Sequence, residues 1–478
     1  MKKTRSVEEV DLISELPEGV LHKILSFLQF KEIVQTSVLS TRWEEVWRTY
    51  PDFTIDVSVF GSDIYEYLLY GCEGEDDEKI RRKKMNLYVC LERLLRNRLS
   101  IEKFKFEFGF FSDPEFESFL HSCVCYAIGS NIKKMKLEFF VSKYHLPPIV
   151  LCSKSIEVLK LRGCEVELPT ESNVKLPSLR KLHLFRIDCK DHVISNLFSG
   201  CPLIEEMICN SCEGLGTVKL FGLYRLNKIK LVDNWDLKAV YIKNSNVTSL
   251  TVSGSTPFKI SVYHCMNLRK ISLELASIKD DWLCKTISEL LVLESLKLGF
   301  CHELKSIKIS SSSLKKLKIK ECPEVVKLQI DTPNLSVFSY SGCMLSFSSN
   351  ALALSNIDLF FDVTRSQWHE RYVKFLAQLN HFAEILDLKV YRAEDVIIPQ
   401  ESRRILHCPL SSVKHLNLNI WHPMICVSFS IAKVMDSLLW IAPHTRAVCV
   451  TLLAYNHPIR WHRTSFEVLY IYILVLRI

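Results

Sequence analysis

The feature that most constrains the fold of this chain is a repeated pattern of apolar residues between residues 101 and 343. Each copy reads apolar-x-x-apolar-x-apolar, and most copies place a cysteine or asparagine eight residues after the first apolar position. Clear copies begin at Ile156, Ile204, Leu226, Leu293, Leu314 and Leu335. Alternating apolar residues are typical of a short strand with one buried face. A unit this short cannot bury its face alone, so the sequence predicts stacked coils, that is, a solenoid.

The spacing of the repeats predicts two kinds of coil. Cys301, Cys322 and Cys343 are 21 residues apart, and further apolar units lie midway between them. We therefore expect two strands per coil there, one on each face. The longer interval from Leu268 to Leu293 should contain a helix that begins near Asp280. The repeat cysteines are expected to be buried, reduced thiols and not a metal or redox site.

Residues 16–51 predict three short helices. Pro17 suits the first turn of a helix, and apolar residues follow it at three-to-four spacing. Thr41 and Glu44 fit a capping box that opens a third helix, with Trp43 as an internal anchor. Three short helices have little room for a core of their own, which indicates that part of their apolar surface needs a partner. Taken alone, this pattern also fits an ordinary helical subdomain packed on the rest of the chain.

The same segment resembles an F-box of the plant type. It has the Leu16-Pro17 start, the Ile24-Leu25-Ser26-x-Leu28 centre and the Arg42-Trp43-x-x-x-Trp47 end, in order and at family spacing. The resemblance implies that it docks on the Skp adaptor, and through it on the cullin, of a Skp–cullin–F-box ubiquitin ligase, while the rest of the chain holds a target protein. The adaptor-binding positions implied are Leu16, Pro17, Leu21, Ile24, Leu25 and Leu28. The repeats resemble the irregular leucine-rich repeats that follow plant F-boxes.

These expectations define an α+β fold class and four segments. We expect a three-helix F-box at 8–56, a linker at 57–84, a leucine-rich-repeat solenoid with parallel strands and irregular coils at 85–360, and degenerate C-terminal repeats at 361–478. The linker is expected because an acidic run at 73–78 is followed by four basic residues at 81–84, which is typical of a solvated loop. No FBD module, which often ends such chains, is recognised.

The sequence offers little support for catalysis. It lacks a Gly-x-Ser-x-Gly elbow, a His-Glu-x-x-His pair, a phosphate-binding loop and a dinucleotide fingerprint. There is no secretory signal and no apolar run of the length that spans a membrane. A net charge of +7 is mild for 478 residues. We therefore expect a non-catalytic receptor without cofactor or metal, in the nucleus, the cytoplasm or both.

Lysine recurs at the exposed middle position of the strand units. The column comprises Lys105, Lys136, Lys160, Lys230, Lys297, Lys308 and Lys318. Lys297 and Lys318, one 21-residue period apart, should be neighbours, whereas Lys308 should face the other side. Such lysines commonly keep a strand face soluble. They also suit an acidic target, so Lys297 and Lys318 are the expected target-binding residues. Alternative roles are a protein or nucleic-acid binder independent of the ligase, with nucleic acid less favoured, or a small-molecule co-receptor.

Overall fold

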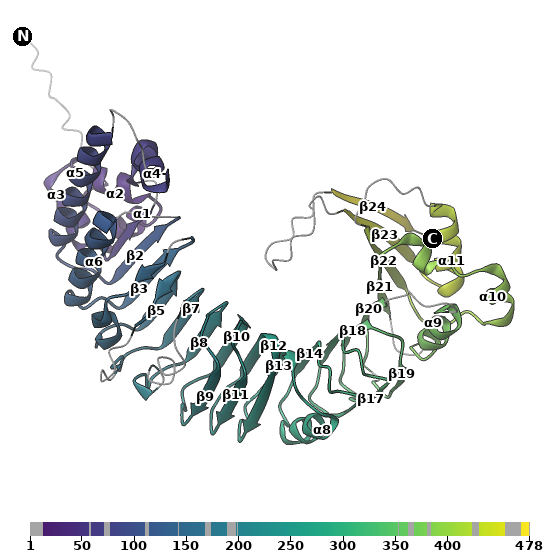
Figure 1. The fold of residues 1–478 in the computed structure, drawn as a ribbon. Helices are drawn as coiled ribbons and strands as arrows, with labels where there is room; N and C mark the ends of the chain where they lie inside the picture. Colours follow the sequence, from purple (N-terminus) through teal and green to yellow (C-terminus); the bar gives the residue numbers. More distant parts are fainter. Residues whose placement is uncertain are drawn as a thin grey trace, which may run out of the picture. The chain divides into compact units, whose positions relative to one another are not determined.

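The structure is a computed structural model of the chain. It describes residues 13–56, 59–70, 77–109, 114–141, 143–167, 174–188, 197, 199–351, 353–361, 368–379, 384–422, 430–454 and 470–477. The chain divides into two compact units. The first comprises residues 1–226 and 230–237, and the second comprises residues 227–229 and 238–478. Figure 1 shows parallel strands in both units, with helices where the coils are longer.

Three short helices lie at the start of the first unit, as the sequence predicts. They are α1 (Glu18–Leu25), α2 (Phe30–Thr36) and α3 (Thr41–Thr49). The cap of α3 differs from the expected box of Thr41 and Glu44. Thr41 is already the first helical residue, and the side chain of Ser40 accepts the Trp43 N–H at 3.2 Å. The serine therefore satisfies one of the donors that the start of a helix leaves free.

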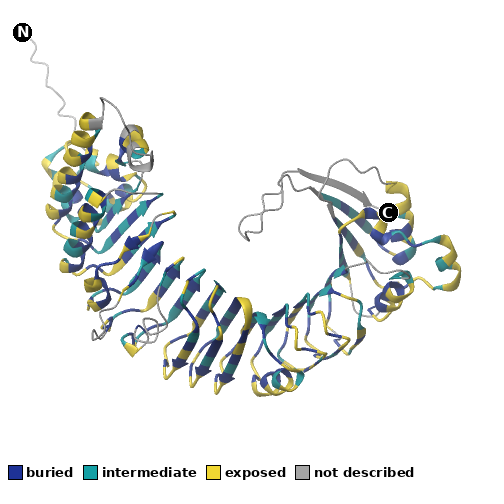
Figure 2. Cartoon of the chain, viewed as in Figure 1, coloured by how far each residue is buried: buried dark blue, intermediate teal, exposed yellow. Residues whose placement is uncertain are grey.

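A strand joins these helices directly to the repeats. Strand β1 (Asp52–Ile55) follows α3 after two residues and pairs in parallel with β2 (Lys103–Phe108). The ladder continues through β3 (Lys134–Phe139), β5 (Val158–Arg162), β7 (Lys181–Phe185) and β8 (Glu206–Asn210). The register places Phe53, Phe104 and Met135 side by side, all buried. Many strands in Figure 2 are banded because buried and partly exposed residues alternate along them.

Helices occupy most of the segment that we expected to be a linker. Helix α4 (Gly61–Tyr70) lies wholly within residues 57–84, and helix α5 (Asp77–Arg96) begins there and continues beyond it. Helix α6 (Pro114–Gly129) follows β2. Helix α5 is fixed by a buried apolar face that includes Tyr88, Leu91 and Leu95. The buried Lys84 belongs to the basic run and pairs with Glu115 of α6 at 2.9 Å. The charge run thus belongs in part to a packed helix and not to a loop.

The coils of the second unit carry two strands each, as the 21-residue spacing predicts. On one face lie β14 (Ser295–Gly299), β16 (Lys316–Lys320) and β18 (Val337–Gly342), paired in parallel. On the other lie β15 (Ser306–Ser310), β17 (Lys327–Asp331) and β19 (Ser346–Ser349), in a separate sheet. The predicted helix is α8 (Asp280–Glu289). The carboxylate of Asp280 accepts the backbone N–H groups of Lys305 and Ser306 and so ties the helix to the next coil.

The sheet of the second unit continues beyond residue 360, where we expected the regular repeats to end. After β11 (Ala239–Lys243), β12 (Ser249–Tyr263) and β13 (Lys270–Ala276), it runs through β14, β16 and β18 to β20 (Asn356–Phe361), β21 (Ile385–Val390), β22 (His415–His422) and β23 (Ala447–Ala454). Strand β24 (Tyr470–Arg477) pairs with β23 in the antiparallel sense. Longer coils there contain α9 (Trp368–Ala377), α10 (Gln400–Ile405) and α11 (Ile431–Ile441). The repeats are longer in this region, but the parallel ladder is unbroken.

Several coils turn through a left-handed residue immediately before the cysteine, asparagine or other small residue at the eighth place of the repeat. Such residues are Ser211, Asp233, His264, Phe300 and Glu321, with φ between 47° and 54°. The backbone N–H of Phe300 donates to the carbonyl of Lys320 at 2.8 Å, and those of Ser211 and Glu321 likewise donate to the next coil. The residue after the turn points inward, and Cys301 and Cys322 are buried there as predicted. Cys343, expected to match them, is exposed. Cys189 lies outside the described residues.

Candidate protein-binding surfaces

The core of the F-box-like segment contains two of the six residues expected to bind an adaptor. Leu21 and Leu25 are fully buried. They pack with Ile33, Trp43, Val46, Trp47 and Tyr50. The four-residue spacing places Leu21 and Leu25 on the inner face of α1, so they hold the helices together. Leu16, Ile24 and Leu28 are partly buried and pack against this core, and Pro17 is exposed.

A group of exposed apolar side chains lies on the same segment. Phe27, Val38 and Leu39 are 76%, 85% and 66% exposed. Ile13 and Val20 are also exposed. Helix α2 ends at Thr36, and Val38 and Leu39 follow it. We call Phe27, Val38 and Leu39 the apolar patch. Val34 and Val38 are four residues apart, a spacing typical of a helix, so the sequence alone did not show that Val38 is exposed.

Arg98 fastens the helical segment to the first repeats. Its guanidinium is buried, lies 4.6 Å from the centre of the Trp47 ring, and donates to the carbonyl of Trp47 and, at 2.9 Å, to that of Asp52. Burial lowers the pKa of Arg98 to about 10, while Tyr50 and Asp52 act in the opposite sense. The cation thus links the end of α3, the start of β1 and the end of α5. All three belong to the first unit.

Two of the four column lysines in the first unit are neutralised by glutamates. Lys105 pairs with Glu107 and Lys136 pairs with Glu138, each at 2.7 Å between nitrogen and carboxylate oxygen. Each glutamate is two residues after its lysine, so both side chains lie on the same face of the strand. The column therefore does not form a continuous basic surface.

In the second unit the expected neighbours Lys297 and Lys318 are in register on β14 and β16. Their environments differ, however. The Lys297 ammonium lies 2.5 Å from a carboxylate oxygen of Glu274 on β13, whereas Lys318 forms no ion pair among the described residues. Lys308 lies on β15, in the opposite sheet, as predicted. Of the two lysines expected to bind a target, Lys318 is the one with its charge available.

Strand β16 has two further lysines on the face that carries Lys318. Lys316 and Lys320 flank it at alternate positions, and Leu317 and Ile319 between them are buried. The Lys320 ammonium lies 4.9 Å from the centre of the Phe300 ring. Partial burial lowers the pKa of Lys318; Asp358 opposes this effect, and the positive charge of Lys297 adds to it. We call Lys316, Lys318 and Lys320 the lysine row.

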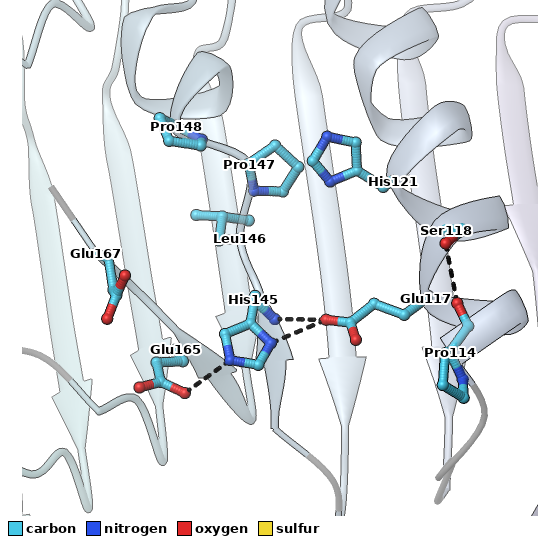
Figure 3. Close-up of a pocket in the computed structure, with 10 residues that line it drawn as sticks. All are labelled: Pro114, Glu117, Ser118, His121, His145, Leu146, Pro147, Pro148, Glu165 and Glu167. Atoms are coloured by element: carbon cyan, nitrogen blue, oxygen red, sulfur yellow. Dashed lines mark hydrogen bonds and ion pairs between the residues drawn. The ribbon is translucent and has the colours of Figure 1, made fainter. Parts of the chain in front are cut away.

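A pocket of about 410 Å³ lies in the first unit between α6 and the short strand β4 (Tyr144–His145). Figure 3 shows His145 between two carboxylates. Its Nδ1 lies 2.9 Å from Glu117, and its Nε2 lies 3.3 Å from Glu165. The bond to Glu117 is the largest cause of a raised pKa at His145, and burial opposes it. His121 also lines the pocket, and proline rings form part of its wall.

Cys209 and Cys212 form a Cys-x-x-Cys pair that the expectation of buried thiols did not consider separately. Both are fully buried, on and just after β8. The Cys212 thiol contacts the carbonyls of Leu184 and Asn210 at 3.6 Å. Among the described residues, no group of three or more His, Cys, Asp or Glu side chains is arranged to hold a metal ion. Nor is any helix in the described part of the chain long and apolar enough to cross a membrane.

Two family models match the chain, and together they account for most of it. The F-box domain model matches residues 13–54. The model described as the leucine-rich-repeat domain of At1g61320/AtMIF1 matches residues 94–271 and 261–436. The residues matched by the F-box model include α1 to α3, the apolar patch and Trp47. The lysine row lies in residues 261–436, the second stretch matched by the repeat model.

The similar proteins are from Arabidopsis thaliana. The F-box/LRR-repeat protein At3g03360 is 22% identical over 66% of this chain and 62% of its own length. The F-box/FBD/LRR-repeat protein At3g52680 is 30% identical over 42% of this chain and 41% of its own length. The F-box/FBD/LRR-repeat protein At2g04230 is 26% identical over 72% of this chain and 69% of its own length. The chain thus spans less than two thirds of the length of the first two.

Proposed function

The chain belongs to the F-box proteins with leucine-rich repeats, and from this membership we propose that it is a substrate-recognition subunit of a Skp–cullin–F-box ubiquitin ligase. In this role the F-box binds a Skp-type adaptor and through it a cullin, and the repeats hold a target protein. The observation that carries the proposal is the apolar patch, which lies inside the residues matched by the F-box model.

The apolar patch supports a protein partner on physical grounds. Exposed apolar side chains on a small helical segment would be more stable in contact with another apolar surface than with water. The core residues Leu21 and Leu25 are already satisfied within the segment. We therefore propose that the adaptor contacts the patch, together with the exposed Pro17 and the partly buried Leu16, Ile24 and Leu28, while the two core residues act indirectly by keeping α1 in place.

The proposed role is non-catalytic. Ubiquitin would be transferred by a separate conjugating enzyme held on the same complex, and this chain would bring the target to it. Binding both partners to one scaffold replaces a bimolecular encounter with a local one and raises the effective concentration of the target. No reactive group of the chain itself is needed for that effect.

Replacing Val38 and Leu39 together with Asp tests the proposal. Both side chains are largely exposed, so the double variant should fold like the parent. Burying two unpaired carboxylates in an adaptor interface would cost several kcal/mol, and co-purification with a Skp-type adaptor should be lost. Val326→Asp is the matched control, because Val326 is exposed in the second unit. Adaptor binding that survives the double substitution, with melting unchanged, would show that the patch is not the docking surface.

A core variant separates loss of folding from loss of docking. Leu25→Asp places a charge among buried apolar residues and should unfold the helical segment itself, as seen in reduced helical circular dichroism. Val38→Asp with Leu39→Asp should leave that signal unchanged. If the double variant loses as much helix as Leu25→Asp, Val38 and Leu39 are needed for folding, and their assignment to an exposed docking patch is wrong.

A further inference from the structure

The lysine row has more positive charge than its surroundings neutralise. Carboxylates near the row bond to other groups: Glu274 on β13 pairs with Lys297, Asp358 on β20 accepts from Lys389 at 2.7 Å, and Glu321, just after β16, accepts from the Ser341 hydroxyl at 2.6 Å. Among the described residues, Lys316 and Lys318 form no ion pair. Three ammonium groups on five consecutive residues therefore lie on one strand face without a carboxylate of their own.

The residues beside the row leave room for another chain. In the register of the sheet, Lys320 has Gly299 on one side and Ser341 on the other. Lys318 has Ser339 on its β18 side. The two serines project little from the sheet, whereas the side chain of Glu274 packs against Gly299, so the lysine side chains stand above their neighbours on the β18 side. A peptide backbone can approach them along the direction of β16.

The spacing of the row matches an extended peptide. Alternate residues of a strand lie about 6.6 Å apart on one face. An extended peptide has the same repeat, so acidic side chains at every second position would meet Lys316, Lys318 and Lys320 in turn. A helical segment presents neighbouring charges three or four residues apart, about 5–6 Å between side-chain positions and along a curved surface.

We propose that the lysine row binds an extended segment of a target protein that carries an acidic group at every second residue. This proposal rests on the function proposed above and names the class of target. Ion pairs on an open face set orientation and association rate more than affinity, so the row would recognise the segment while other contacts retain the target. Carboxylate and phosphate share the necessary chemistry.

Single-stranded nucleic acid also carries regularly spaced negative charge, but the surroundings of the row disfavour it. The basic area is bounded by Glu274 on β13 and by Asp358 and Asp387 on β20 and β21. A backbone of phosphates would pass over these carboxylates within a few strands. Nucleic-acid grooves combine longer basic tracks with aromatic platforms for the bases, and the aromatic ring that contacts the row, Phe300, is covered by Lys320.

The test uses the full chain and fluorescent synthetic peptides of 12 residues. One peptide alternates Asp with Ser, a second has the same composition with its aspartates in one block, a third alternates phosphoserine with Gly, and a fourth probe is oligothymidylate. The parent protein should bind the alternating peptide at least about tenfold more tightly than the block peptide, and added salt should weaken binding. The third peptide then shows whether phosphate or carboxylate is preferred.

The matched variants are two triple charge reversals. Replacing Lys316, Lys318 and Lys320 with Glu should reduce binding of the alternating peptide by at least about tenfold, whereas Lys305, Lys308 and Lys327 to Glu, with the same change in net charge, should leave it unchanged. The control residues belong to the coils of the opposite sheet and are exposed. Replacing Lys316, Lys318 and Lys320 with Gln removes the charges without reversing them. This variant should also bind the alternating peptide more weakly than the parent, which would show that the loss does not come from misfolding caused by charge reversal.

Several outcomes of these experiments overturn the proposal. They are equal binding of the alternating and block peptides, equal loss in the two reversal variants, and preferential binding of oligothymidylate that depends on the row. Absence of binding to every probe also overturns it. Adaptor co-purification is measured on the same proteins, so a failed peptide assay with intact adaptor binding rejects the target class and leaves the ligase role standing.

Discussion

The guanidinium carbon of Arg98 lies 4.6 Å from the centre of the Trp47 ring, which joins the residue just after α5 to the last turn of α3. The same cation donates to the backbone carbonyl of Trp47 and to that of Asp52 at the start of β1. A single side chain thus supplies both ring contact and hydrogen bonds where the F-box meets the first strand. Removal of the Arg98 side chain should therefore lower the stability of the whole N-terminal region.

Arg98→Met should destabilise the chain by about 2–4 kcal/mol. The methionine keeps the apolar contact but removes two hydrogen bonds from a charged donor, one to the Trp47 carbonyl and a partly buried one to the Asp52 carbonyl. A hydrogen bond to a charged group contributes about 1.5–3 kcal/mol, and the Trp47 carbonyl keeps the Tyr50 N–H as a second donor. Urea unfolding followed by tryptophan fluorescence measures the change. Arg93→Met is the control, since Arg93 is exposed on α5 and should change stability by less than about 0.5 kcal/mol. Equal effects of the two substitutions would contradict the role given to Arg98.

Cys322 should be inert toward thiol reagents in the native protein, whereas Cys343 should react. The first is buried at its turn and the second is exposed. Cys322→Ser should cost about 1–3 kcal/mol, because a hydroxyl needs a stronger hydrogen-bond partner than a thiol, and Cys322→Ala should cost less. Mass spectrometry after timed alkylation distinguishes the two thiols. Rapid modification of Cys322 before unfolding would show that this thiol is accessible in the folded protein and would contradict its burial.

Alanine at two glycines should change stability in opposite directions. Gly163 has φ of 63° at a coil turn, where alanine would be strained, so Gly163→Ala should destabilise by about 1 kcal/mol. Gly129 is the last residue of α6, and a methyl group there would meet nothing within 4 Å. Gly129→Ala should stabilise by about 0.5–1 kcal/mol. Thermal melts of both variants test the pair, and the same sign for both would refute the assignment of the turn.

His145 should make stability depend on pH. Its folded-state pKa is raised, chiefly by the bond to Glu117, so the contribution is fully present below the unfolded-state value of about 6.5 and is lost as pH rises through the folded-state value. His145→Gln should remove this dependence. His121→Gln, in the same pocket, is the control and should keep it. Melting temperatures across pH 5 to 9 provide the comparison; a parallel pH profile for both variants would exclude His145 as the source.

Much of the solenoid could be predicted from the sequence because its signals are local and periodic. Cys301 and Cys322 mark a fixed period, and the register of Lys297 with Lys318 follows from that period. The helix that begins at Asp280 could be predicted for a similar reason, since the interval between strands is too long for a turn. In each case the spacing of residues along the chain determines their neighbours in space.

Other features depended on contacts that spacing does not reveal. An apolar stripe on α1 indicates that one face is covered, but it does not say whether Leu25 meets its own chain or a partner. The Lys297 charge is offset by Glu274, which is 23 residues earlier and in another coil. The basic run near Lys84 looked like a solvated loop because its partner, Glu115, lies on α6. The segment expected to be a linker therefore differs from the prediction, whereas the adaptor-binding residues stay a prediction.

The direct passage from α3 into β1 has a mechanical consequence. Because β1 pairs with β2, the F-box and the first coils share one sheet and have no free tether between them. On the proposed function, a protein held along β2 or β3 would be presented to the ubiquitin-charged enzyme in a fixed pose. Its acceptor lysines would then compete by their distance from that enzyme's thioester, so modification would be selected by location on the target's surface and not by the amino acids around each lysine.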